Sequence, residues 1–214
     1  PQLPIENILG EPLRRNTAPC VSYAAFKIAA KNPDANIVVA PSDHIITKEN
    51  AFVEAINKGL SFTAQNDCLL TLGITPSRPD TGYGYIQFVD EKHNETNKIF
   101  KVKTFTEKPN LEMARFFLQS GEFVWNAGIF LWNLKSILKA LKEHLPEMYH
   151  LFEEGNSVYN SKDESAFIKT AYSQCTNISI DFGVMEKAKN VFVMSAEFGW
   201  SDLGTWASLY DFSD

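Results

Sequence analysis

The sequence contains little cysteine and no long apolar run. Its 214 residues include three cysteines, Cys20, Cys68 and Cys175, which are too far apart to form a Cys-x-x-Cys pair. Isolated thiols of this kind predict buried, reduced side chains in a reducing compartment, and hence a cytoplasmic protein. The longest uncharged apolar runs, such as residues 37–40 and 127–132, are only as long as a strand. The sequence therefore excludes a membrane-spanning helix, and we expect no membrane partner.

Positive charge is also scarce. The chain has 20 Lys and Arg residues against 26 Asp and Glu residues, which gives a net charge of −6. Proteins that hold a nucleic-acid backbone present a basic surface that releases its counterions, so we expect no nucleic-acid partner. The four histidines follow no Ser/His/Asp or Cys/His order, so nothing indicates a nucleophilic enzyme.

The pattern that is present is typical of a sheet covered by helices. Thr17 is a typical N-cap for the helical run that follows it, and residues 37–40 are apolar on both faces, as in a central parallel strand. Residues 48–65 and 68–73 repeat the helix and the strand. This alternation predicts an α/β protein with a mixed, mostly parallel sheet flanked by helices. Because no repeat or Gly/Ser linker interrupts the chain, residues 1–214 are predicted to form one domain.

The second half follows a different pattern. Residues 85–108 alternate between apolar and polar side chains around a highly polar segment, which predicts antiparallel strands joined by an exposed turn. We expect a short helix at residues 111–119, a strand at 127–132 and a helical stretch over 134–152 that a proline interrupts. Asp181 is predicted to cap the helix that follows it.

Two acidic residues stand in positions that suit a ligand site. Open parallel sheets bind ligands outside the carboxyl ends of their strands, and Asp43 follows such a strand within Pro41-Ser42-Asp43-His44. Its carboxylate suits either a divalent metal or an Asx-turn. Asp202 is the only charge between Gly199 and Trp206, where two tryptophans and two glycines fit neither helix nor strand. A functional loop and a packed corner both explain that stretch.

Three further motifs leave a similar choice. The glycines of Thr81-Gly82-Tyr83-Gly84-Tyr85 allow backbone to approach a ligand, and they equally suit the entry to a hairpin. Neighbouring side chains of a strand point to opposite sides, so Glu107 and Lys108 at the end of a strand fit either a binding site or a surface charge pair. Trp125-Asn126-Ala127-Gly128 is either a sugar cradle or a turn.

Taken in order, these segments resemble the mannose-1-phosphate guanylyltransferase family, also called GDP-mannose pyrophosphorylases. The resemblance covers essentially all 214 residues, and several motifs in one order are far more specific than any one of them. The motifs are Glu11-Pro12-x-x-Arg15-Asn16-Thr17-Ala18-Pro19, Pro41-Ser42-Asp43-His44, Pro79-x-Thr81-Gly82-Tyr83-Gly84-Tyr85-Ile86, Phe105-x-Glu107-Lys108-Pro109, Trp125-Asn126-Ala127-Gly128-Ile129-Phe130, Ser179-Ile180-Asp181 and Gly199-Trp200-Ser201-Asp202-x-Gly204-Thr205-Trp206.

The resemblance implies a Rossmann-like nucleotide-diphospho-sugar transferase fold. It also implies a nucleotidyltransferase that makes GDP-mannose and pyrophosphate from GTP and mannose 1-phosphate. Glu11 is assigned to guanine, because its carboxylate accepts from the ring N–H and the exocyclic amine together. Asn16 and Thr17 belong to the same substrate-binding string. Asp43 and Asp202 are assigned to one Mg²⁺, which offsets charge on the phosphates.

The sugar phosphate is assigned to the remaining motifs. Lys108 holds the phosphate and is counted, with the two metal acids, among the catalytic residues. Glu107 accepts hydrogen bonds from the mannose hydroxyls. The other substrate-binding positions that the resemblance implies are Tyr83, Gly84, Asn126 and Gly128, where the glycines let backbone groups approach the ring.

One feature of the family is not found in the sequence. Members begin with a strand and a glycine-rich loop whose arginine, with a later lysine, cradles the triphosphate, whereas Gly10 is isolated here and Arg15 belongs to a later motif. The sequence also stops just past Trp206, where members continue. We therefore expect an N-terminally truncated catalytic domain that has little or no transferase activity by itself.

Two other functions remain open from the sequence. One is a pyrophosphorylase for another sugar or nucleotide, because a single sequence does not fix sugar stereochemistry. The other is a non-catalytic sugar-nucleotide-binding protein, against which the intact acids Asp43 and Asp202 argue. A homodimer is compatible with the sequence, which does not specify the oligomeric state.

Overall fold

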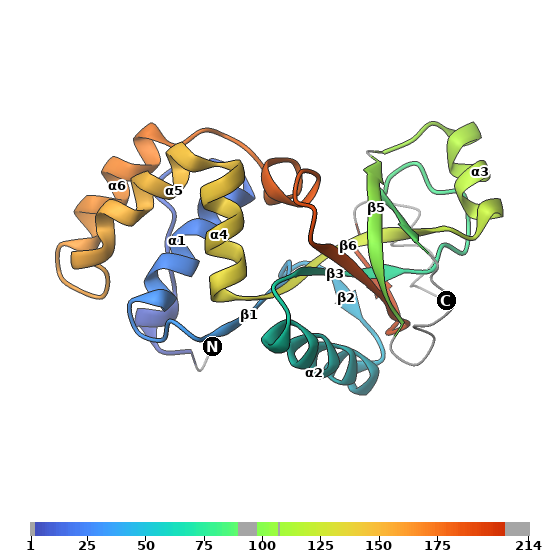
Figure 1. The fold of residues 1–214 in the computed structure, drawn as a ribbon, viewed down its shortest axis with the longest axis horizontal. Helices are drawn as coiled ribbons and strands as arrows, with labels where there is room; N and C mark the ends of the chain where they lie inside the picture. Colours follow the sequence, from blue (N-terminus) through green and yellow to red (C-terminus); the bar gives the residue numbers. More distant parts are fainter. Residues whose placement is uncertain (1–2, 90–97, 107, 204–214) are drawn as a thin grey trace. The chain divides into compact units, whose positions relative to one another are not determined.

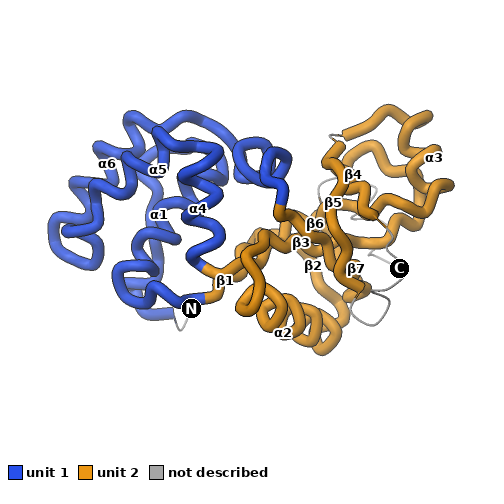
Figure 2. The backbone as a smooth tube through the Cα atoms, viewed as in Figure 1, with its two compact units in different colours: residues 1–35, 134–189 blue, residues 36–133, 190–214 orange. Residues whose placement is uncertain are grey.

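The computed structural model describes residues 3–89, 98–106 and 108–203, and the chain divides into two compact units (Figures 1 and 2). Unit 1 comprises residues 1–35 and 134–189, and unit 2 comprises residues 36–133 and 190–214. Each unit is thus assembled from two separate stretches of sequence. The assignment of residues 1–214 to one catalytic domain stays a prediction.

Unit 1 is helical and has an aromatic core. Phe26 is 3% exposed, and its ring centroid lies 5.2 Å from that of Tyr149 and 6.4 Å from those of Phe152 and Tyr159. Burial of such rings is the main stabilising contribution in a small helical unit. The elements are η1 (Ile5–Asn7), α1 (Thr17–Ala29), α4 (Leu134–His144), α5 (Pro146–Glu153), η2 (Glu154–Ser157), α6 (Glu164–Gln174) and the π-helical η3 (Asp181–Met185).

The helix boundaries confirm one prediction and correct two. The break at Pro146 is confirmed, because this proline opens α5 at a position where its missing N–H costs nothing. The N-cap of α1 is Asn16 rather than Thr17: the Asn16 side chain accepts from the Thr17 N–H at 2.9 Å. The Thr17 hydroxyl accepts from the Ile180 N–H at 2.8 Å instead. The capping role expected for Asp181 is wrong, because Ile180 is the cap residue and Asp181 is already inside η3.

Unit 2 contains the sheet. Its strands are ordered β1-β6-β3-β7-β5-β4, and an additional pairing of β4 with β6 closes the strands from β6 to β4 into a ring. The short strands β2 and β8 pair separately. The elements are β1 (Asn36–Val39), β2 (Ile45–Ile46), α2 (Glu49–Gln65), β3 (Leu69–Ile74), β4 (Tyr85–Val89), β5 (Ile99–Thr106), α3 (Leu111–Ser120), β6 (Phe123–Asn133), β7 (Val191–Ser195) and β8 (Trp200–Ser201).

The α/β class and the mixed sheet with its helices are confirmed. The expectation that most neighbouring strands are parallel needs correction. β1, β3, β4 and β7 run in one direction, but β3 and β7 are the only parallel neighbours among the described strands, because β5 and β6 lie between the others. β1 is an edge strand, antiparallel to β6, rather than a central parallel strand. Apolar side chains on both faces of a strand indicate that other elements pack on both faces. They do not identify the strand that is its hydrogen-bond partner or the direction of the pairing.

The apolar faces of α2 and α3 cover separate parts of the core. Phe52, Ala55, Ile56 and Leu60 of α2 pack against a buried cluster that contains side chains of β3, β5, β6 and β7 together with Phe198, as the helical spacing predicts. Ala114 and Phe117 of α3 join a second cluster, which contains Tyr83, Tyr85, Phe123 and Trp125. None of the helices in the described part of the chain is long and apolar enough to cross a membrane.

The cysteines are free, and two of the three are buried as predicted. Burial raises the pKa of Cys68 to about 11 and, despite the nearby Arg15, that of Cys175 to about 11. Cys20 is exposed, which corrects the expectation of three buried thiols.

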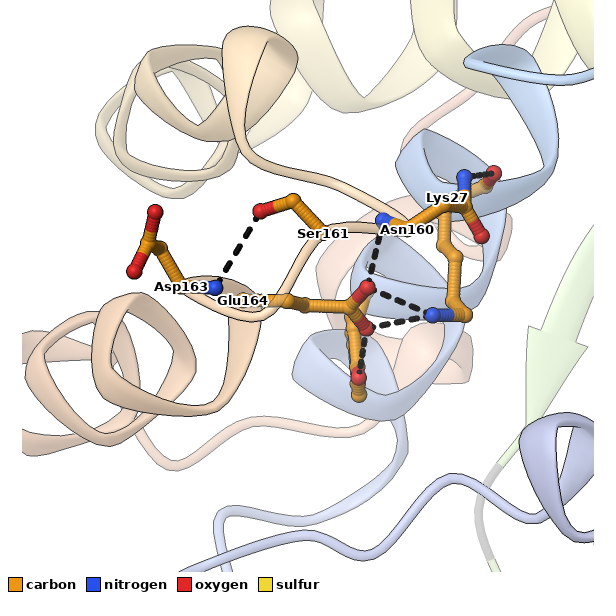
Figure 3. Close-up of polar contacts among 6 residues, drawn as sticks. Lys27, Asn160, Ser161, Asp163 and Glu164 are labelled. Atoms are coloured by element: carbon orange, nitrogen blue, oxygen red, sulfur yellow. Dashed lines mark hydrogen bonds and ion pairs between the residues drawn. The ribbon is translucent and has the colours of Figure 1, made fainter.

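A buried carboxylate ties α6 to α1 in unit 1 (Figure 3). Glu164 begins α6 and accepts from the Lys27 ammonium at 2.6 Å on both of its oxygens. It also accepts from the Asn160 N–H at 2.6 Å and from the Tyr23 hydroxyl. The Lys27 and Glu164 side chains are only 16% and 9% exposed. Burial alone raises the pKa of this carboxyl, but these donors outweigh it and hold the pKa of Glu164 below its usual range.

Replacing Lys27 by Met tests this ion pair. We expect a loss of about 3 kcal/mol in the free energy of unfolding, because Glu164 is left charged and buried without its cation. The pair stabilises the fold above pH 4.5, the ordinary pKa of the carboxyl, and this contribution is lost as the pH falls through the lowered folded-state pKa. Urea unfolding at pH 7 and pH 3 measures both effects.

Lys135→Met is the matched control. Lys135 contacts Asp34 at 2.7 Å, but these side chains are 78% and 74% exposed, so we expect a loss of less than about 1 kcal/mol. Equal losses in the two variants would contradict a special role for the buried pair.

Candidate functional site

A two-residue ladder brings the predicted metal acids to one place. β2 pairs antiparallel with β8, with Ile45 opposite Ser201. The ladder continues beyond the strands, where the Thr47 N–H donates to the Gly199 carbonyl at 3.0 Å. Asp43 lies just before β2 and Asp202 directly follows β8, so the antiparallel pairing places both acids at the same end of the ladder.

Gly199 makes this ladder sterically possible. Its φ is +64°, and a Cβ atom added there would lie 1.9 Å from the Thr47 Oγ1. Any other residue would have to adopt the left-handed conformation and displace the Thr47 side chain. The close approach of the two backbone segments therefore requires a glycine before Trp200.

Tyr83 holds Asp202 from a buried position. Its hydroxyl donates to the Asp202 Oδ1 at 3.2 Å, and its ring lies 4.9 Å from that of Trp125 and 5.2 Å from that of Trp200. Burial, together with the charge of Asp202, raises the pKa of Tyr83 to about 12, so the hydroxyl keeps its proton. Tyr83 is 7% exposed, and its hydroxyl contacts the acid that is predicted to hold a metal.

Trp200 fixes the orientation of His44. The Trp200 Nε1–H donates to the His44 Nδ1 at 3.0 Å across 156 positions of sequence. A neutral imidazole that accepts at Nδ1 carries its proton on Nε2. Burial lowers the pKa of His44, although the negative charges of Asp43 and Asp202 oppose this shift. His44 is therefore held as a neutral ring with an Nε2–H donor beside the two acids.

The predicted sugar-binding backbone lies along the same side of unit 2. Gly128 has a φ of +67°, and a Cβ there would lie 4.0 Å from the His44 Cε1. The Asn126 side chain accepts from the Gly128 N–H at 3.1 Å, and the Asn126 N–H donates to the Gly84 carbonyl at 2.9 Å. The structure thus brings these three positions together with His44. Gly84 is outside the left-handed region, and a Cβ added there would lie at an ordinary contact distance of 3.5 Å from the Thr106 carbonyl oxygen, so the structure gives no steric reason for a glycine there.

The predicted Glu107-Lys108 motif follows β5. Thr106 ends that strand opposite Tyr85, next to the Gly84 backbone. Lys108 is exposed two positions further along the chain. Glu107 lies outside the described residues.

The predicted nucleotide residues Glu11, Asn16 and Thr17 lie in unit 1. Glu11 is exposed, and its Oε1 accepts from the Tyr172 hydroxyl at 3.0 Å. It lines a groove of about 480 Å³ together with residues of η1, α1, α6 and the segment before α6. The charged side chains of this groove include the cations Lys27, Lys162 and Lys169 and the carboxylates Glu6 and Glu164. Asn16 caps α1 and Thr17 binds the Ile180 N–H, so both have structural contacts of their own.

Two carboxylates are the ligands that this site offers a metal. Among the described residues, no group of three or more His, Cys, Asp and Glu side chains is placed to hold an ion. Asp43 and Asp202 fit Mg²⁺, which takes oxygen ligands and is usually held by one or two carboxylates with phosphate and water in its other positions.

Sequence reasoning missed the roles of Trp200 and His44. The histidines match no catalytic order, and the tryptophans between Gly199 and Trp206 fit either a functional loop or a packed corner. The signal was that each lies beside a candidate metal acid: His44 directly follows Asp43, and Trp200 precedes Asp202 by two positions.

Trp200→Phe tests the orientation of His44. The variant keeps the ring but loses the N–H donor, so we expect the Nδ1-protonated tautomer of His44 to become populated. Nitrogen chemical shifts of the imidazole at pH 8 distinguish the two tautomers. The exposed His150 serves as the internal control, and an unchanged His44 spectrum in the variant would contradict the assignment.

Comparison with known proteins identifies relatives that align with nearly the whole of this chain. A mannose-1-phosphate guanylyltransferase of Salmonella montevideo is 39% identical over 212 residues, and a mannose-1-phosphate guanylyltransferase 2 of Escherichia coli O157:H7 is 37% identical over 214 residues. Both alignments cover 97% of this chain, and the chain spans only 44% of the length of either relative.

A solved structure and a family profile agree with these sequence relatives. A crystal structure described as mannose-1-phosphate geranyltransferase from Thermus thermophilus superposes with a TM-score of 0.83 at 31% identity, covering 96% of this chain and 58% of that one. The sequence profile of the family described as "Nucleotidyl transferase" matches residues 4–214. Because that match covers nearly the whole sequence, the chain belongs to the nucleotidyl transferase family.

Proposed function

We propose that this chain forms part of a mannose-1-phosphate guanylyltransferase. The observation that carries the proposal is the β2–β8 ladder, which brings Asp43 and Asp202 to one end within a chain of the nucleotidyl transferase family. Relatives that bear this activity in their names support the choice of sugar and base. Because the chain spans less than half of those relatives, the activity is proposed for the protein that contains it.

In the proposed reaction, a phosphate oxygen of mannose 1-phosphate attacks the α-phosphorus of GTP. The bond from that phosphorus to the bridging oxygen breaks, and pyrophosphate leaves with the electron pair. Asp43 and Asp202 would hold the divalent ion, with Tyr83 keeping Asp202 in place. Bound Mg²⁺ supplies the positive charge that stabilises the phosphate oxygens in the transition state.

The remaining residues position the substrates. Lys108 is exposed and reaches the sugar phosphate as a flexible cation. Asn126 and the backbone at Gly84 and Gly128 contact the mannose ring, since they are adjacent and lie beside His44. Glu107 accepts hydrogen bonds from mannose hydroxyls. The neutral His44 adds an N–H donor next to the acids, with no charge that would compete for the metal.

Glu11 selects guanine in this proposal. One of its oxygens already accepts from Tyr172, and a carboxylate has further lone pairs for the N–H groups of the base. Lys162 and Lys169 line the same groove, beside Glu6 and the Lys27–Glu164 pair. Asn16 and Thr17 support the site by fixing the start of α1. The free thiols agree with a cytoplasmic protein, and GTP and mannose 1-phosphate are the proposed substrates.

Asp202→Asn tests the proposed metal role. In the longest natural form of the protein that contains this chain, we expect GDP-mannose formation to fall at least about 100-fold, because a metal ligand and its negative charge are lost. Pyrophosphate release from GTP and mannose 1-phosphate, titrated with Mg²⁺, measures the effect. The exposed Asp34→Asn is the control and should keep full activity. A wild-type protein that binds the sugar nucleotide without turnover would instead favour a non-catalytic binding protein.

Glu11→Gln tests base selection. The amide keeps the size of the side chain but presents a donor where guanine also presents one, so we expect the preference for GTP over ATP in kcat/KM to fall by about tenfold or more. Glu6→Gln changes charge in the same groove and should leave the preference unchanged. An unaltered preference in Glu11→Gln would contradict the assignment.

A further inference from the structure

The string of residues that begins with Glu11 is fastened to the end of α6 and to the residues that follow that helix. The Arg15 Nε–H donates to the Tyr172 carbonyl at 3.3 Å, 157 positions later in the chain. The Ile178 N–H donates to the Arg15 carbonyl at 3.3 Å, and the Ala18 N–H donates to the Ile178 carbonyl at 3.1 Å. The backbone that carries the predicted guanine-binding residue therefore has a fixed support within unit 1.

The Tyr172 side chain reaches from this support to Glu11. Its hydroxyl donates to the Glu11 Oε1 at 3.0 Å, and the residue is 0% exposed. Its ring makes edge contacts with Tyr23 and Phe152, whose ring centroids lie 6.5 Å and 5.9 Å away at interplanar angles of 82° and 85°. Close packing on several sides restricts a ring to one rotamer, so the hydroxyl has a defined position.

This hydroxyl remains a proton donor. Burial of Tyr172, together with the negative charge of Glu11 and the hydrogen bond to it, raises the pKa of the hydroxyl well above the usual range of tyrosine. A hydrogen bond that a carboxylate accepts is stronger than one between two neutral groups. Tyr172 therefore offers Glu11 a permanent donor at a fixed place.

The plane of the Glu11 carboxylate would otherwise be poorly defined. The last torsion of a glutamate side chain has broad minima, and Glu11 is exposed, so packing does not set its angle. Paired hydrogen bonds from guanine require both carboxylate oxygens to lie close to the plane of the base. A rigid donor on Oε1 restricts this rotation before the nucleotide binds, and less conformational freedom is then lost on binding.

We propose that Tyr172 is the positioning residue for base selection, which holds the Glu11 carboxylate in the plane that pairs with guanine without touching the nucleotide itself. The inference rests on the proposed function, because that function assigns guanine to Glu11. Tyr172 lies 161 positions from Glu11 and outside every motif of the sequence, so only the fold reveals the contact.

Equilibrium binding of GTP and of ATP tests this role in the longest natural form of the protein that contains this chain. Calorimetry without mannose 1-phosphate measures both affinities. Tyr172→Phe removes the hydroxyl and keeps the ring, and water can replace the lost donor at the exposed Glu11, so we expect the variant to fold. We expect its preference for GTP over ATP to fall about fivefold, through weaker binding of GTP, because one hydrogen bond to a carboxylate is lost.

Two further variants separate positioning from stability. Tyr159→Phe is the matched control, because it removes another buried hydroxyl of unit 1, which donates to the Phe152 carbonyl at 2.7 Å. It should keep the wild-type preference. Glu11→Ala removes the group through which Tyr172 acts, so adding Tyr172→Phe to it should not change the preference further. A purely structural tyrosine would instead weaken the binding of both nucleotides equally in either background.

Several results would overturn the proposal. These are an unchanged preference in Tyr172→Phe, an equal loss in Tyr159→Phe, a further loss when Tyr172→Phe is added to Glu11→Ala, or a Tyr172→Phe variant that does not fold, since the hydroxyl would then be structural. A wild type without a preference for GTP, or a Glu11→Ala variant that keeps it, would overturn the base assignment as well. Selective binding of GTP without GDP-mannose synthesis would contradict the proposed activity alone, because no arm of this titration involves turnover.

Discussion

The pairing of β2 with β8 is the constraint on which the candidate site depends. Each strand has two residues, yet the ladder joins a segment near residue 45 to one near residue 200 and sets both acids at one end. The backbone bond from Thr47 to Gly199 and the absence of a Cβ at Gly199 keep the two chains close. A ladder this short gains little from its hydrogen bonds alone, so the surrounding rings must hold it in place.

Those rings also determine the state of the polar groups beside them. Tyr83 and Trp200 are packed 5.2 Å apart, and each donates one hydrogen bond, to Asp202 and to His44 respectively. Donors held by packing need little reorganisation when a charged ligand arrives, which is the general basis of electrostatic preorganisation.

Much of the fold could be predicted from the sequence, because long periodic segments determine it. The apolar face of α2, the antiparallel β4 and β5, and the break at Pro146 all follow from spacing and from the missing N–H of proline. The edge position of β1 could not be predicted, because the pattern of side chains in a strand does not specify which strand lies next to it. The β2–β8 ladder could not be predicted either, because strands of two residues are too short to show a periodic pattern. The resemblance of the motifs identified Asp43 and Asp202 as candidate metal ligands. The supporting roles of Trp200 and His44 could be recognised only from their contacts in the structure.

In the proposed site, Asp43 and Asp202 together hold one divalent ion. Binding of Mn²⁺, followed by electron paramagnetic resonance, tests it most directly in the wild type, Asp43→Asn, Asp202→Asn and the double variant, because Mn²⁺ prefers the same oxygen ligands as Mg²⁺. Residues that share one ion are strongly coupled, so we expect either single substitution to abolish the signal of bound Mn²⁺ and the second substitution to change nothing more. Independent, additive losses, or full binding in either single variant, would contradict it.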